Sequence, residues 1–364
     1  MTERAVFLTG GSGLVGAEVV SQLRAADRRV IVLTHRKQTI VDSAGREFPA
    51  TDFAADPAAP VTYVCGDVRE PGFGLSTELR AALAERVEVL VHSAATTDFA
   101  AAEELYQELN VGGARNAAAL ALEWGVPLVY VSTAYVCGRR DGVITEDQHG
   151  EDSGFGNPYE QSKFTAERYI RDCPGLDWAI VRPGIVTGRT GTGAIRDKKN
   201  LYTVVRLITE GKLRTLPGRY DADLALAPVD FVAAVVTAVV ADTGRARGRT
   251  FHAVGAGGVS LRVMSDVFAE YPSFEVARFV PPSSFRVDDL DDLEREYYER
   301  IGVQYVSYFD RKRVFVTDEV TTTLRLTVPV TDTDYLRTLL DRCLEDGFLG
   351  AALPTVSEVV ECSN

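Results

Sequence analysis

The chain of 364 residues is longer than one ordinary core requires and too short for three, so we expect one large domain with a smaller appendage. Its composition, with 46% hydrophobic and 25% charged residues, is typical of a globular protein. The net charge of −13 disfavours nucleic acid and anionic membranes as partners, because both carry negative charge.

We expect neither a signal peptide nor a membrane span. The first apolar run, Ala5–Leu8, lacks the basic segment, longer apolar stretch and cleavage site of a signal peptide. No stretch reaches the roughly 18–20 apolar residues that cross a bilayer. The five cysteines are odd in number, far apart and without a CxxC pair, and the four histidines are isolated. This pattern predicts reduced thiols, no metal site and a cytoplasmic location.

Strand and helix patterns alternate from the start of the chain. Helical patterns occupy Leu14–Ala25 and the segment after Asn110 that includes Ala117–Leu122. Continuous apolar segments that we interpret as buried strands are Val6–Thr9, Arg29–Thr34, Val61–Cys65, Val87–His92, Leu128–Ser132 and Trp178–Arg182. Such strands, separated by helices, are typical of a parallel sheet covered on both faces. The predicted fold class is therefore α/β, with a doubly wound parallel Rossmann-type sheet and a small C-terminal substrate lobe.

The pattern changes after Arg182. Gly, Thr, Lys and Arg crowd residues 184–199, and helical patterns follow at Leu201–Glu210 and Val229–Val240, the second apolar enough to pack back on the sheet. Residues 273–335 mix prolines, an acidic run and short strand-like pieces. We predict a dinucleotide-binding domain of residues 1–183 plus about 225–255, a substrate-binding lobe of about 184–224 and 256–350, and a C-terminal tail of 351–364.

A glycine-rich turn, TGGSGLVG at residues 9–16, joins the first strand to the first helix. Glycines permit a tight turn and let backbone N–H groups approach a pyrophosphate at the helix N-terminus, while Gly16 lets the helix press close to the sheet. A flexible loop is the alternative for glycines in isolation, but the position between strand and helix favours a dinucleotide site. The expected cofactor contacts are Gly10, Ser12, Gly13, Leu14 and Gly16.

The end of the second strand discriminates between the two nicotinamide cofactors. NAD-binding folds usually place Asp or Glu there to accept hydrogen bonds from the ribose 2′-hydroxyl. This chain has Thr34-His35-Arg36-Lys37 instead. Because a guanidinium binds a 2′-phosphate bidentately and stacks on adenine, Arg36 and Lys37 favour NADPH/NADP+. A solvated basic turn is the alternative.

The most informative segment is NPYEQSK at residues 157–163. Asn157 suits a helix N-cap and Pro158 the first helical position, with Glu160 able to close a capping box. Tyr159 and Lys163 then fall four residues apart on one helix face. The ammonium and the helix N-terminus are expected to lower the phenol pKa from its usual value of about 10. A tyrosine so placed can protonate a carbonyl oxygen as hydride reaches carbon.

A hydroxyl residue follows the fifth strand, at the sheet edge where such folds bind ligands. We expect Thr133 to hydrogen-bond the reacting oxygen, with Ser132 as the competing candidate. A YxxxK spacing alone also occurs in ordinary amphipathic helices. The combination of Thr133, Tyr159 and Lys163 favours an enzyme over a non-catalytic NADP-sensing or scaffold protein.

These motifs resemble those of the extended short-chain dehydrogenase/reductases. The segment TGGSGLVG matches their TGxxGxxG loop, and Thr133, Tyr159 and Lys163 match their catalytic Ser/Thr, Tyr and Lys. The resemblance implies that Asn110 supports the active site. It also implies further cofactor contacts beside Lys163, on the turns and stretches that follow the third, fourth and sixth strands: Asp67, Val68, Ala94, Ala95, Pro183 and Gly184.

Within this superfamily the sequence is similar to the branch of thioester reductases, fatty acyl reductases and male-sterility proteins. The similarity covers about residues 5–255 and lies in YVSTAYVCG, GFGNPYEQSKFTAE, VRPGIVTG and LPGRYDADLALAPVDFVAAVV. It implies NADPH-dependent reduction of an acyl thioester to an aldehyde or alcohol. Since the chain has neither an adenylation region nor the serine motif of a carrier protein, the acyl group would arrive as a CoA ester or on an acyl carrier protein in trans.

Two other activities stay open. One is reduction of a ketone or aldehyde, or oxidation of an alcohol, on a small natural-product or steroid-like substrate. The other is sugar-nucleotide epimerisation or dehydration, which would normally retain NAD and therefore fits Arg36 poorly.

Basic clusters at Arg311-Lys312-Arg313 and Lys198-Lys199 could receive the phosphates of CoA or of a carrier's phosphopantetheine. A solvated basic stretch is the simpler interpretation of residues 311–313. Core packing is the default expectation for His92, Cys137 and Phe279.

Overall fold

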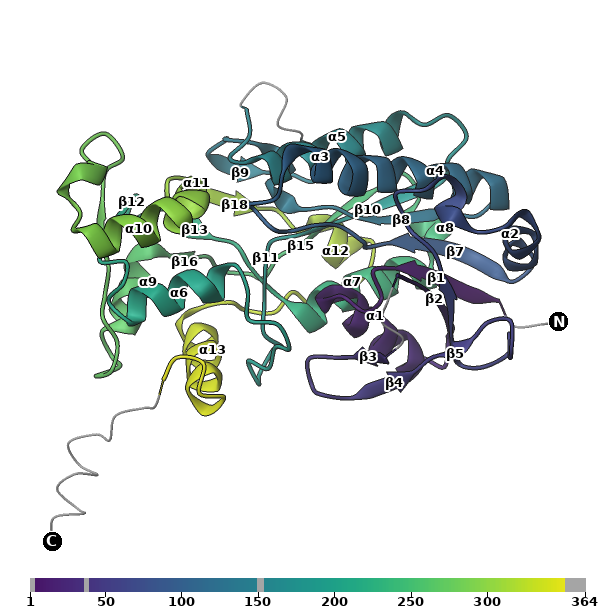
Figure 1. Ribbon diagram of the computed structural model, residues 1–364, viewed down its shortest axis with the longest axis horizontal. Helices are drawn as coiled ribbons and strands as arrows, with labels where there is room; N and C mark the ends of the chain where they lie inside the picture. The colour runs from purple at the N-terminus through teal and green to yellow at the C-terminus, as the bar shows by residue number, and fades with distance from the viewer. Residues whose placement is uncertain (1–3, 36–38, 149–153, 351–364) are drawn as a thin grey trace, which may run out of the picture.

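The computed structural model describes residues 4–35, 39–148 and 154–350 (Figure 1). Its centre is an eight-stranded sheet in the order β15-β10-β8-β7-β1-β2-β6-β5, and every neighbouring pair is parallel. The prediction of a Rossmann-type parallel sheet is confirmed. The strands are β1 (Ala5–Thr9), β2 (Arg29–Thr34), β5 (Thr51–Asp52), β6 (Val61–Cys65), β7 (Val87–His92), β8 (Leu128–Val131), β10 (Trp178–Pro183) and β15 (Thr250–Ala253).

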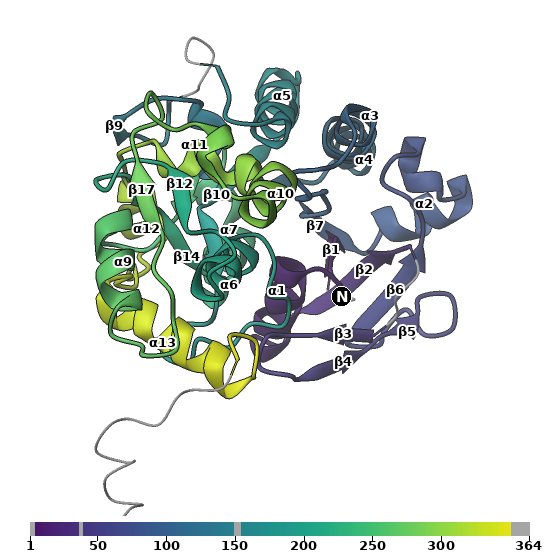
Figure 2. The ribbon, with the colours of Figure 1, turned by 60° about the vertical axis from the view of Figure 1, so that its left-hand side comes forward.

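Helices cover both faces of this sheet, which is why its strands are apolar throughout (Figure 2). In β1, for example, Val6 and Leu8 face one apolar cluster while Ala5 and Phe7 face the other. The first cluster includes helices α1 (Leu14–Ala25) and α7 (Val229–Ala241), and the second includes α2 (Thr77–Ala84), α4 (Gly113–Trp124) and α5 (Pro158–Asp172). The prediction that the helix near residue 229 packs back on the sheet is therefore confirmed.

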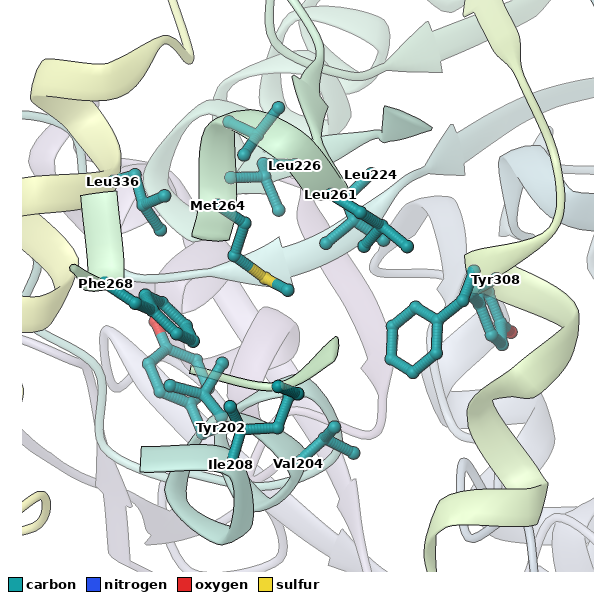
Figure 3. Close-up of a cluster of buried hydrophobic side chains, with 14 of the residues drawn as sticks. Tyr202, Val204, Ile208, Leu224, Leu226, Leu261, Met264, Phe268, Tyr308 and Leu336 are labelled. Carbon is teal, nitrogen blue, oxygen red and sulfur yellow. The ribbon is translucent and has the colours of Figure 1, made fainter. Parts of the chain in front are cut away.

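A second group of helices lies at one end of the sheet (Figure 1). Its apolar cluster has Met264 projecting into the middle and includes Phe268, Leu261 and Leu336 (Figure 3). Phe279 also belongs to this cluster, as expected for core packing. The principal elements are α6 (Leu201–Thr209), β12 (Thr215–Pro217), α9 (Leu261–Phe268), β17 (Arg278–Val280), α10 (Asp292–Arg300), α11 (Val306–Phe309) and α13 (Thr333–Glu345).

Short elements connect the two parts. Strand β18 (Arg313–Phe315) pairs in parallel with β9 (Gly142–Ile144), and β11 (Ile185–Thr187) pairs with β14 (Leu226–Pro228). The remaining short elements include β3 (Thr39–Val41), β4 (Glu47–Pro49), α3 (Glu103–Leu105), β13 (Asp223–Leu224), α8 (Thr243–Ala246), β16 (Val259–Ser260) and α12 (Asp318–Thr322). Among the described residues, no helix is long and apolar enough to cross a membrane.

Candidate active site

A cleft of about 380 Å³ lies where the carboxyl ends of the central strands meet the second group of helices. It is lined by segments that are far apart in the sequence: the glycine turn, the residues after β7, β8 and β10, helix α5, and residues around 200 and 305. The structure brings together in this cleft twelve of the residues singled out from the sequence, including the competing candidate Ser132: Gly10, Gly13, Leu14, Gly16, Ala95, Ser132, Thr133, Tyr159, Lys163, Pro183, Gly184 and Lys199.

The glycine turn between β1 and α1 has the shape of an anion-binding loop. Gly10 has a φ of +70°, and its carbonyl accepts a hydrogen bond from the Gly13 N–H at 2.9 Å. A Cβ atom on Gly16 would lie 2.1 Å from the Gly10 oxygen, so the close approach at Gly16 is to the turn itself. No side chain caps α1 at Gly13, which leaves N–H groups of the first helical turn available for a phosphate.

Helix α5 begins as its sequence predicts. The Asn157 side chain accepts the Glu160 N–H at 2.9 Å, and Pro158 occupies the first helical position. The Glu160 carboxylate accepts the N–H of Gly156 at 2.7 Å, one residue before the expected partner of a capping box. The position at which the helix begins determines which of its faces is turned toward the cleft. Tyr159 and Lys163 lie on that face, and both line the cleft.

Asn110 lies beside the cleft and holds two of its walls together. It sits in a π-helical segment, η2 (Tyr106–Gly112), a rare conformation that is frequent at functional sites. Its side-chain oxygen accepts the Thr96 N–H at 2.9 Å, and its amide donates to the Ser162 hydroxyl at 2.9 Å. The Ser162 hydroxyl donates in turn to the Tyr159 carbonyl at 2.8 Å. Asn110 therefore ties the loop after β7 to helix α5.

The electrostatics of the central pair differ from the sequence-based expectation. Burial of the Tyr159 hydroxyl raises its pKa above the usual value, although a hydrogen bond with Thr133 opposes the shift. The prediction of a lowered Tyr159 pKa is thus wrong for the protein alone. The Lys163 ammonium donates to the Val131 carbonyl at 2.7 Å, and its own burial lowers the pKa of Lys163 to about 7. Desolvation penalises the charged form of both groups and outweighs the opposing effects, which come from Thr133 on Tyr159 and from Glu167 on Lys163.

Several predicted cofactor contacts do not line the cleft. The Ser12 carbonyl accepts a hydrogen bond from Arg196 at 3.0 Å, and the Ala94 N–H donates to the Thr9 hydroxyl at 3.3 Å. Asp67 pairs with Arg69 at 2.6 Å, which holds the pKa of that carboxyl at about 2. Val68 is buried. Arg36 and Lys37, which carry the prediction of NADPH, lie outside the described residues.

Two of the three basic residues at 311–313 are enclosed, which corrects the expectation that they dock a phosphate; Lys312 is exposed and lies 3.8 Å from Asp221. Arg311 and Arg313 are each 4% exposed. The Arg311 guanidinium donates to the Gly138 carbonyl at 3.0 Å and pairs with Glu160 at 3.3 Å. Arg313 donates to the Cys137 sulfur at 3.4 Å. A charge that is enclosed and partnered in this way cannot receive a phosphate from outside.

The second predicted cluster is split. Lys198 pairs with Asp346 at 2.6 Å, whereas Lys199 is exposed and lines the cleft. His92 and Cys137 are core residues, as expected. The His92 ring bonds the Thr9 hydroxyl at 2.8 Å, and burial lowers the pKa of His92 to about 3.

An aromatic wall completes the cleft, and sequence reasoning missed it. Phe99 stacks on Tyr308 with 5.8 Å between ring centres, and it also contacts Tyr159 at 5.7 Å and Tyr305 at 5.5 Å. Tyr135 meets Tyr308 edge-on at 4.7 Å. Tyr135 belongs to the quoted segment YVSTAYVCG, but nothing in the local sequence indicates that residues near 305 would pack beside it.

A family model described as male sterility protein matches residues 8–236, which is more than half of the chain. The chain belongs to this family. The predicted membership of the extended short-chain dehydrogenase/reductases, in the branch of male-sterility proteins, is confirmed.

This male-sterility-family protein is 28% identical over 292 residues to the fatty acyl-CoA reductase wat of Drosophila melanogaster, covering 68% of this chain and 56% of the relative. It is 27% identical over 263 residues to the L-2-aminoadipate reductase large subunit of Penicillium chrysogenum, covering 65% of this chain and 18% of the relative. The chain thus spans about half or less of the length of these curated relatives.

Among solved structures, the terminal R domain of the myxalamid PKS-NRPS biosynthetic pathway is similar with a TM-score of 0.80 and 25% identity, covering 97% of this chain and 93% of that one. A thiolation-reductase di-domain from an archaeal non-ribosomal peptide synthetase shares the fold, with a TM-score of 0.69 and 17% identity over 95% of this chain and 76% of that one.

Proposed function

We propose that this protein is an NADPH-dependent reductase of acyl thioesters, which releases an aldehyde or an alcohol. The observation that carries the proposal is the convergence of Thr133, Tyr159 and Lys163 on the cleft that also contains the glycine turn. Similarity to a terminal R domain over nearly the whole of both chains favours this chemistry over other reactions of the same fold.

The residues present fit a dinucleotide cofactor. The uncapped first turn of α1 and the turn at Gly10 suit a pyrophosphate, which prefers backbone N–H donors at a helix N-terminus. Lys163 uses one of its three N–H donors on Val131, and two remain for the cofactor or substrate. When bound, a reduced nicotinamide supplies hydride.

The chain's own residues provide the acid and the oxyanion contacts. Because the pKa of Tyr159 is raised, the phenol is protonated at neutral pH and can donate to the thioester oxygen as negative charge develops there. We assign Thr133 as the second hydrogen-bond donor to that oxygen, since its hydroxyl lies within reach of Tyr159. The hemithioacetal so formed collapses when the carbon–sulfur bond breaks and the thiol leaves, giving the aldehyde. Asn110 is a positioning residue that acts through Ser162 on α5.

We infer that the acyl donor is CoA or an acyl carrier protein. Two basic clusters were considered for binding a phosphate of the acyl donor. Arg311 and Arg313 are buried, and Lys199 is the member of these clusters that lines the cleft. An NADPH-oxidation screen tests the function: acyl-CoAs and carrier-bound acyl chains are compared with free aldehydes and ketones of the same length. Consumption with thioesters supports the proposal. Reduction of ketones or aldehydes without any thioester activity contradicts it and favours a carbonyl reductase.

Replacing Arg36 by alanine is expected to weaken NADPH binding about tenfold or more and to leave NADH binding nearly unchanged. The reason is loss of a charged hydrogen bond to the 2′-phosphate, which contributes about 1.5–3 kcal/mol. Dissociation constants from fluorescence titration check this. Equal or tighter binding of NADH by the unmodified protein would contradict the preference.

The apparent second-order rate constant for NADPH, kcat/KM, is expected to be flat below pH 7 and to fall above it. This quantity reports ionisation of the free enzyme, and the pKa of Lys163 is about 7 because its ammonium is buried. The charged form is therefore lost as pH rises through that value. Lys163→Arg keeps the charge, so its remaining activity should lack the fall near pH 7. An identical fall in both proteins would assign the titration to another group.

A further inference from the structure

Tyr135 belongs to the wall of the cleft and carries a buried hydroxyl that the proposed chemistry does not use. Tyr135 lies on the turn η3 (Ala134–Cys137), lines the cleft and is 3% exposed. Its hydroxyl has no hydrogen-bond partner within the described part of the chain. The neighbouring hydroxyls differ: Tyr308 accepts from Asn157 at 3.3 Å, and Tyr305 donates to Asn200 at 3.5 Å. A buried polar group without a partner needs an explanation, because almost all such groups in folded proteins are paired.

Tyr135 is suited to donate a hydrogen bond. Burial raises the pKa of Tyr135 to about 12, so the phenol is protonated at neutral pH. The amide of Ala225 lies close by, but an N–H group can only donate to the phenol oxygen and leaves the phenolic proton without an acceptor. The Arg313 guanidinium packs 4.7 Å from the centre of the Tyr135 ring. Its positive charge strengthens the O–H group as a donor and disfavours a cationic partner.

The position of this hydroxyl indicates which part of a substrate it would meet. Ring contacts run from Tyr159 to Phe99, from Phe99 to Tyr308, and from Tyr308 to Tyr135. Tyr135 therefore lies further along the aromatic wall than the proposed proton donor. A thioester carbonyl held at Tyr159 would extend its acyl chain along this wall toward Tyr135.

We infer that Tyr135 is a specificity-determining residue that donates a hydrogen bond to an oxygen atom on the acyl chain. The preferred substrates are then thioesters of oxygenated acyl groups, bearing a hydroxyl, oxo or amide oxygen, rather than of plain alkyl chains. This inference rests on the proposed function, because it places the acyl chain in the cleft. A plain chain would leave the phenol unpaired in the complex, and a site built to bind a polar substrate group discriminates strongly against an analogue that lacks it.

The test uses the full chain and acyl-CoAs of one length: octanoyl-CoA and its derivatives with a single hydroxyl at carbon 3, 4 or 5. The unmodified protein should favour at least one hydroxylated substrate by about tenfold or more in kcat/KM. Tyr135→Phe should bring that ratio to within about threefold of one. Tyr305→Phe is the matched control, since the Tyr305 hydroxyl already donates its proton to Asn200 at 3.5 Å, and it should leave the ratio unchanged.

Three results would overturn the inference. The unmodified protein could show a kcat/KM ratio near one for every hydroxyl position, or the preference could survive in Tyr135→Phe. The third is that Tyr135→Phe lowers kcat/KM equally for octanoyl-CoA and for its hydroxylated derivatives. The last would place the hydroxyl at the reacting carbonyl. If no thioester is reduced, the proposed function fails. The inference is then tested without turnover, by measuring with calorimetry the dissociation constants of octan-1-ol and of its derivatives with a second hydroxyl at carbon 3, 4 or 5. Tyr135→Phe should also keep or raise Tm, because it removes an unpaired buried hydroxyl; a lower Tm would contradict the premise.

Discussion

Replacing Tyr159 by phenylalanine is expected to lower kcat for the reductase reaction by at least about 100-fold while leaving the dissociation constant for NADPH nearly unchanged. Positioned acid–base catalysis typically contributes about 10²–10⁴-fold, and phenylalanine lacks the proton that the developing alkoxide needs. The ring itself remains, so its contact with Phe99 at 5.7 Å is kept. Steady-state kinetics give kcat, and fluorescence titration gives cofactor affinity.

Lys163→Ala serves as the contrasting variant. It removes the ammonium that bonds the Val131 carbonyl and lines the cleft, so both kcat and NADPH affinity should fall. A Tyr159→Phe protein that retained more than about a tenth of kcat would have another proton donor. In that case Thr133, whose hydroxyl hydrogen-bonds Tyr159, would be the next residue to replace.

Replacing Arg182 by methionine is expected to lower the free energy of unfolding by about 3–5 kcal/mol, because it leaves a buried carboxylate without its principal partner. The Arg182 and Glu167 side chains are both 0% exposed and pair at 2.5 Å. The same guanidinium donates to the carbonyls of Glu146 and Gln148, each at 3.1 Å. Arg171 still pairs with Glu167 at 2.9 Å in such a variant, but from one side only. Urea unfolding measures the change.

An exposed pair provides the control for this stability prediction. Arg337 contacts Glu270 at 2.7 Å with 37% and 46% of the two side chains exposed, so Arg337→Met should leave the urea midpoint almost unchanged. The double variant Arg182→Met with Glu167→Leu should regain part of the lost stability, because an apolar pair needs no compensating charge. A loss below about 1 kcal/mol for Arg182→Met would show that the buried network tolerates removal of the principal partner of Glu167.

The features that the sequence determined by itself are those encoded within a few neighbouring residues. Apolar runs predicted six of the eight strands of the central sheet to within one residue at each end, with Leu128–Ser132, for example, ending one position earlier, at Val131. The two edge strands, β5 and β15, were not predicted. The cap at Asn157 and the spacing of Tyr159 and Lys163 predicted one helix face correctly, because capping and the helical repeat are local properties.

Only the tertiary structure decided the environment of these groups. Arg311 looked like surface charge but pairs with Glu160, which is 151 residues away, and the aromatic wall joins Phe99 to residues near 305. The pKa of Tyr159 rises instead of falling for the same reason: desolvation depends on everything packed around a group, and that packing comes from distant segments. Local sequence therefore determined which chemical groups meet along one helix face, while burial by the rest of the chain decided their charge, their partners and the shape of the cleft.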